Sequence, residues 1–273
     1  MRAPIPFHES FPRPFRAMLA LLPDAPWYVL AAIPLVIVAA YTVFGATGFG
    51  SSLISVPALA HFFPLTFVVP LVTALDVAAV ANAGRRQWRH ADFGEFLRIL
   101  PAMLAGIAVG ATLLVNLPRG PALLLLGIFV VVYGAYLLGG QREWKALHPG
   151  WAWPLGLAGG VFSVLFGTGG PIFMIFLAAR IHDKSRLRAT SSIVVTVSVS
   201  IRAAVFIATG LLAHAQILLL AGLLVPAMFA GYLLGNRLHH ALSRRRVIHL
   251  IAALLVANGA LLVLRALAVL REE

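Results

Sequence analysis

Two clusters of glycine and hydroxyl residues contain the side chains of this chain best suited to bind a ligand. The first comprises Thr47, Gly48, Gly50, Ser51 and Ser52, and the second comprises Gly167, Thr168, Gly169 and Gly170. Both lie inside long apolar stretches, where glycine weakens a helix and the proline that follows cannot continue its hydrogen bonds. A helix that restarts after such a break presents free N–H groups and a partial positive charge, which suit an anion. Glycines that only let helices pack closely are the alternative, and the presence of two such clusters favours a binding site.

Asp76 and Arg202 are the outstanding ionisable residues within apolar stretches. A charge near the middle of a bilayer is costly and usually faces a cavity or a partner. In the helices expected around them, the two side chains lie ~16 Å and ~12 Å below the same membrane surface. We therefore expect them to pair or to share a substrate cavity, with Arg202 attracting an oxyanion and Asp76 carrying a coupling proton. A purely structural ion pair is the alternative.

Hydroxyl residues form a second matched pair, Thr73 in the first half and Thr190 with Ser191 in the second. Their offset of 117 residues (190 − 73) is close to the 119 residues (167 − 48) that separate Gly48 from Gly167. They could line an anion path, or they could bond to the backbone, as Ser and Thr often do in membrane helices. The histidines show no metal-site spacing and cysteine is absent, so we expect neither a metal site nor a cofactor.

The surrounding chain has the composition of a membrane protein. It is 61% hydrophobic and 11% charged, whereas a soluble domain needs polar side chains over its surface. Apolar runs fall near residues 27–63, 65–83, 95–117, 121–139, 151–179, 188–210, 215–236 and 247–270. Because several reach the ~20 residues that cross a bilayer as a helix, we predict an all-α polytopic protein embedded in the lipid bilayer.

The chain also contains an internal duplication. The segment PAMLAGIAVG, which begins at Pro101, is matched by PAMFAGYLLG, which begins at Pro226, at an offset of 125 residues (226 − 101). Both have the small residues of a helix-packing motif, and the sequence leaves open whether the partner helix belongs to the same chain or to a second copy in a homodimer. We divide the chain into a tail or interfacial helix (1–26), a first repeat (27–139), a cytoplasmic linker (140–150) and a second repeat (151–273).

Run length and loop charge predict how the repeats cross the membrane. The glycine clusters break the runs at 27–63 and 151–179 into arms of roughly 12–18 residues, which reach the membrane middle but barely span it. Basic residues, which give a net charge of +12, concentrate in links that become cytoplasmic if both broken runs are re-entrant. We therefore expect two inverted repeats, each a glycine-broken helical hairpin followed by three transmembrane helices. Because the basic residues lie in links between apolar runs, we expect no nucleic-acid partner. Conventional crossing by one or both broken runs is the alternative.

These motifs resemble those of the TauE/SafE sulfite exporter family, also called the toluene sulfonate uptake permeases. The resemblance covers about residues 30–265 and is carried by the first glycine cluster with Val56 and Pro57, by Thr73, by FGTGGP at 166–171, by RATS at 188–191 and by Arg202. It implies secondary transport of small, commonly sulfur-containing anions across the inner membrane. It also implies that the two glycine motifs, Thr73, Thr190, Ser191 and Arg202 form the site, whereas Asp76 is not assigned by it.

The function expected is therefore a carrier, with export as the direction that the resemblance implies. A small anion such as sulfite or an organosulfonate would bind near the membrane midplane between the two broken helices, and rocking of the halves would expose it to each side in turn. A passive anion channel on the same scaffold is the first alternative. An intramembrane enzyme is the second, and we do not expect one because Ser51 has no histidine at matching depth.

Overall fold

The computed structural model describes residues 18, 21–22, 27–83, 90–139, 147–241 and 244–272. Over these residues the chain is helical and has no strand, which confirms the predicted all-α class. The helices are α2 (Trp27–Thr47), α3 (Ser51–Ala60), α4 (Leu65–Ala83), α5 (Phe93–Asn116), α6 (Arg119–Leu138), the 3-10 helix η4 (Pro149–Trp151), α7 (Ala152–Phe166), α8 (Gly169–Arg180), α9 (Lys184–Ala208), α10 (Ala215–Ala241) and α11 (Arg244–Glu272). The N-terminal segment and the linker predicted at 1–26 and 140–150 lie mostly outside the described residues.

Seven helical segments of the described chain are long and apolar enough to cross a membrane. They are α2, α5, α6, α7 together with η4, α9, α10 and α11. Two helices, α2 and α4, differ from the expectation. α2 has 21 residues, or ~31 Å as a helix, and is longer than the arm predicted for a re-entrant hairpin. α4, expected to span, falls among the shorter apolar helices with α3 and α8.

Both overlong apolar runs break at the predicted glycine clusters. α2 ends at Thr47 and α3 begins at Ser51, while α7 ends at Phe166 and α8 begins at Gly169. Gly48, Gly50 and Gly167 have φ angles of 83°, 99° and 70°. Only glycine adopts this left-handed region without strain, so the sequence and the backbone agree on where each helix must stop.

The duplicated PAM motif packs helices together within one chain. A Cβ added at Gly106 on α5 would overlap the carbonyl oxygen of Leu157 on α7, and one added at Gly235 on α10 would overlap that of Thr42 on α2. Each motif thus lies against the first arm of the broken helix in the other half of the chain. This confirms the packing interpretation and answers the question of the partner helix, which belongs to the same chain.

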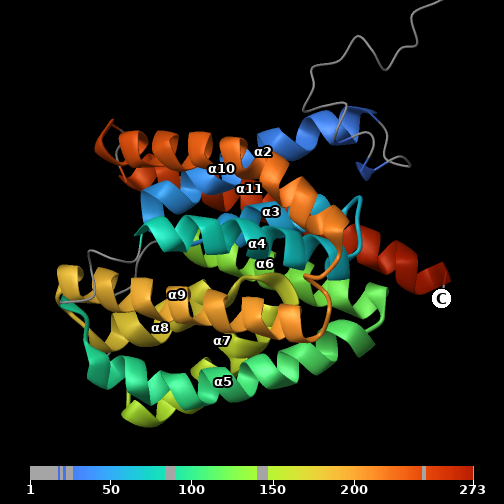
Figure 1. Ribbon diagram of the computed structural model, residues 1–273. Coiled ribbons are helices and arrows are strands. Elements are labelled where there is room, and N and C mark those ends of the chain that lie inside the picture. The colour runs from blue at the N-terminus through green and yellow to red at the C-terminus, as the bar shows by residue number, and fades with distance from the viewer. Residues whose placement is uncertain are drawn as a thin grey trace, which may run out of the picture.

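These contacts assemble two groups of helices, each drawn from both halves of the sequence (Figure 1). Bundle A contains α2, α3, α4 and α10, and bundle B contains α5, α7, α8 and α9. The remaining helices, α6 and α11, pack along each other and also contact α3. The segments 27–139 and 151–273 are therefore not separate bodies in space, because α5 of the first joins bundle B and α10 of the second joins bundle A.

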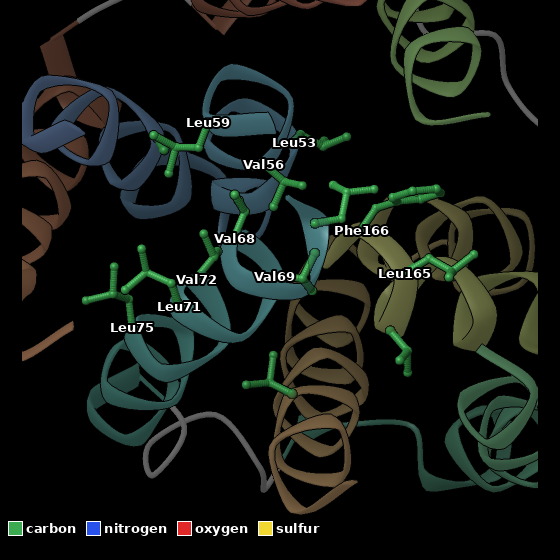
Figure 2. Packing of buried hydrophobic residues seen from close by; sticks show 14 of the residues in the cluster. Leu53, Val56, Leu59, Val68, Val69, Leu71, Val72, Leu75, Leu165 and Phe166 are labelled. Atoms are coloured by element: carbon green, nitrogen blue, oxygen red, sulfur yellow. The ribbon is translucent and has the colours of Figure 1, made fainter. Parts of the chain in front are cut away.

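The apolar core lies where the two bundles meet. Figure 2 shows Phe166 at the end of α7 close to Val56 and Leu53 of α3 and near Val69 of α4. Phe166, Val56 and Val69 are fully buried. On the outside the molecule instead exposes large apolar side chains, including Leu35, Val132, Leu219 and Leu264, as expected for surfaces that face lipid.

Candidate functional site

The two helix breaks touch each other between the bundles. A Cβ added at Gly167 in the second break would lie 2.6 Å from Ser52 Oγ beside the first, and one added at Gly170 would lie 3.4 Å from Phe49 Cβ. A cavity of about 30 Å³ lies at this contact, lined from both breaks and by Asp76 of α4. The space could hold little more than ordered water, and we call this arrangement of the two breaks closed for that reason.

Asp76 forms the centre of a buried hydrogen-bond network. Its Oδ1 accepts hydrogen bonds from the hydroxyls of Tyr41 (2.7 Å) and Ser51 (2.8 Å). Its Oδ2 accepts from the hydroxyl of Ser52 (3.2 Å) and from Nη2 of Arg202 (3.0 Å). The carboxylate is 3% exposed and has two partners on each oxygen. The expected pairing of Asp76 with Arg202 is therefore present in the structure.

Arg202 lies behind the second break and is 1% exposed. Besides Asp76 it binds the carbonyl oxygen of Ser163 through Nη1 at 2.8 Å, and the Ser163 hydroxyl is 2.8 Å from that of Ser198. Nε of Arg202 is buried and has no hydrogen-bond partner. Tyr41 and Ser163 were missed in the sequence, although a tyrosine in the middle of the apolar run of α2 was a usable signal.

The N-termini of two helices lie at the cavity. α3 begins after Gly50 and α8 begins after Thr168, and neither has a side-chain cap. The first N–H groups of a helix have no partner within it, so they are available to an acceptor. Thr168 lines the cavity and is 1% exposed, and its buried hydroxyl also lacks a partner. A buried polar atom without a partner is costly, and a ligand oxygen would satisfy it.

The cavity has an apolar side as well as a polar one. Phe44 and Phe49 come from the first broken helix, and Val195 and Val199 come from α9. Such an amphipathic lining suits a small ligand with an anionic head and an apolar body.

Several predicted site residues lie elsewhere. Thr73 donates to the carbonyl oxygen of Val69, Thr190 bonds to the backbone N–H of Asp92 and the carbonyl of Arg186, and Ser191 donates to the carbonyl of Arg188. None of the three lines the cavity. Thr190 precedes Arg202 by twelve residues, which is ~18 Å along α9. The backbone-bonding alternative therefore describes these hydroxyls.

The remaining residues of the two clusters have structural surroundings. Thr47 is exposed and bonds to the carbonyl oxygens of Val43 and Phe49, and Gly48 is an exposed turn residue. A Cβ added at Gly169 would meet Ser163 on α7 at 2.8 Å, so this glycine permits α8 to approach α7. Among the described residues no group of three His, Asp or Glu side chains could hold a metal ion.

Comparison with known proteins agrees with this arrangement. The sequence profile of the family described as "Sulfite exporter TauE/SafE" matches residues 33–262. A protein of Comamonas testosteroni named "Probable inner membrane transporter protein TsaS" is 33% identical over 191 residues, covering 69% of this chain and 80% of that protein. No solved structure matches the chain. The chain therefore belongs to the TauE/SafE sulfite exporter family of membrane transporters, as its motifs predicted.

Proposed function

We propose that this protein is an inner-membrane secondary transporter of a small sulfur-containing anion, which binds in the cavity between the two helix breaks. The observation that carries the proposal is the unpartnered, buried hydroxyl of Thr168 at the start of α8. Together with the N–H groups at the starts of α3 and α8, which have no partner within their helices, it offers donors to an oxyanion. The relative from Comamonas testosteroni is itself named as an inner membrane transporter.

The lining favours an organosulfonate over an inorganic anion. A sulfonate head would accept from Thr168 and the helix N-termini, while the organic body would contact the apolar side formed by Phe44, Phe49 and Val195. Sulfite or sulfate would leave that apolar side in contact with water or a charge. The cavity must widen to admit either ligand, because about 30 Å³ is too small for a sulfonate.

Alternating access would arise from movement of bundle A against bundle B. The cavity lies between them, and each bundle carries one of the two breaks. Rocking of one bundle would open the cavity first to one side and then to the other. Asp76 would carry a coupling proton in this cycle, because protonation removes the negative charge that faces the cavity. Tyr41 and Arg202 are the titratable groups that face it.

Transport by purified protein in liposomes tests the proposal. Uptake of labelled sulfoacetate should saturate, should be inhibited by unlabelled sulfoacetate more than by sulfite, sulfate or thiosulfate, and should change with a pH gradient. A carrier also exchanges external for trapped internal substrate, whereas a passive channel lacks this exchange. Uptake equal to that of protein-free liposomes for every anion would contradict the proposal.

A further inference from the structure

We propose that the Asp76 carboxylate is an internal competitor of the transported anion: in the closed protein it occupies donors that an incoming oxyanion takes over. Its release from Arg202 then loosens the contact between bundle A and bundle B. This inference rests on the proposed function. It adds the event that links anion binding to the movement of the bundles.

The surroundings of Asp76 are those of a bound anion. Three hydroxyl groups and one guanidinium group donate to its two oxygens, at distances from 2.7 to 3.2 Å. A transported sulfonate or sulfite ion would need the same kinds of donor, since guanidinium groups and hydroxyls form strong hydrogen bonds with oxyanions. The place for an anionic head beside Arg202 is thus already filled by a carboxylate of the chain.

The carboxylate also stands between the cavity and the guanidinium group. Asp76 lines the cavity, whereas Arg202 is nearly fully buried and lies against Gly167. An anion that enters meets a negative charge before it can reach the positive one. Because like charges at contact distance disfavour each other, the anion can take Arg202 only when Asp76 turns away or is protonated.

The pair that must separate is the one ion pair that joins the bundles within the described ranges. Asp76 belongs to α4 of bundle A and Arg202 belongs to α9 of bundle B. The other ion pairs of the described chain, Arg98 with Glu95 and Arg180 with Glu95, lie inside bundle B. Replacement of Asp76 by the anion therefore removes the charge contact that holds the bundles together.

This exchange would make opening depend on the substrate. Separating a buried ion pair without a substitute leaves an uncompensated charge, which is strongly unfavourable. Arg202 will not leave Asp76 until another anion is present to pair with it. The empty protein therefore stays closed, and the membrane does not leak ions when no substrate is bound.

Binding measurements on the purified full chain in detergent test the inference. Isothermal titration with sulfoacetate and with sulfite, at one fixed pH, compares wild type with Asp76→Asn, which keeps the shape but removes the charge. The variant should bind at least about tenfold more tightly. Tyr41→Phe removes one hydrogen bond to Asp76 and does not line the cavity, so it should bind about twofold to fivefold more tightly.

Glu95→Gln is the matched control, because Glu95 is a buried carboxylate paired with arginine outside the cavity. Its affinity should stay within about twofold of wild type. Unchanged or weaker binding by a monodisperse Asp76→Asn would overturn the inference while leaving the proposed function in place. If that variant does not fold, unchanged or weaker binding by Tyr41→Phe has the same meaning. Absence of binding by wild type and all variants would overturn the proposed function and the inference together.

Discussion

The two helix breaks occupy matching places in the two halves, yet the structure uses them differently. At the first break, the hydroxyls of Ser51 and Ser52 at the start of α3 donate hydrogen bonds to the Asp76 carboxylate. At the second, the Thr168 hydroxyl at the start of α8 is buried and has no partner. The first break thus holds a carboxylate of the chain, while the second keeps a donor free for a ligand.

The space around the backbone also differs between the two breaks. Gly48 lies in an exposed turn where an added Cβ would meet no atom within 4 Å. Gly167 is enclosed: an added Cβ would lie 2.6 Å from Ser52 Oγ and 3.2 Å from Nη1 of Arg202. The second break is therefore the tightly fitted side of the contact, and the first is the side with room to move.

Alanine at Gly48 and at Gly167, one left-handed glycine from each break, should reveal the largest difference between the two breaks. Gly167→Ala combines a strained φ of 70° with overlap of Ser52, so we expect about 2–4 kcal/mol lost stability and no measurable uptake. Gly48→Ala has a similar φ of 83° but open surroundings, so we expect about 1–2 kcal/mol and retained uptake. Thermal unfolding in detergent and sulfoacetate uptake measure both effects. Equal losses in the two variants would show that the breaks are equivalent.

Removal of the free hydroxyl tests whether the second break holds the ligand. Thr168→Val should weaken sulfoacetate binding by about 5- to 30-fold, corresponding to about 1–2 kcal/mol for one hydrogen bond. The ligand-free protein should be as stable as wild type or more stable, because valine leaves no unpaired polar atom. Thr209→Val is the matched control, since its hydroxyl bonds the carbonyl of Val205 at an exposed position. Normal affinity in Thr168→Val would remove the hydroxyl from the site.

The apolar side of the cavity should give the smallest effect. Phe49→Ala removes a ring contributed by the first break and enlarges the space for the organic body of the substrate. We expect the ratio of transport efficiency for a bulky sulfonate to that for sulfoacetate to rise about threefold to tenfold. Competition assays with benzenesulfonate and sulfoacetate measure the ratio. An unchanged ratio would mean that the organic body does not lie against Phe49.

Much of the fold could be predicted from the sequence because glycine and proline act locally. The positive φ angles at Gly48, Gly50 and Gly167 follow from residue type, so the breaks were found at the right residues. The pairing of Asp76 with Arg202 followed from depth alone, since buried charges in lipid need a partner. The packing of the PAM motifs on α2 and α7 could not be predicted, because a small-residue stripe does not specify which helix it contacts.

The predicted site residues that lie away from the cavity share one physical explanation. The repeat offset matched Thr190 and Ser191 with Thr73 in depth, but all three hydroxyls bond to the backbone of the chain. In apolar helices such as α2 and α4 no periodic pattern marks the side that faces a cavity, and in α9 the hydroxyl residues are spread around the helix. For the same reason Tyr41 and Ser163 were overlooked, although both bond directly to the Asp76–Arg202 pair. The sequence does not show how each helix is rotated about its axis, and this rotation decides which side chains face the cavity.

The central claim is that an anion binds where the two helix breaks meet. Crystals of the full chain grown with 4-bromobenzenesulfonate test it directly, because the anomalous signal of bromine locates the organic body. A bromine peak is expected beside Phe44, Phe49 and Val195, with the sulfonate density against Thr168 and the start of α8. A ligand bound away from both breaks, with the Asp76–Arg202 pair and the cavity unchanged, would contradict it.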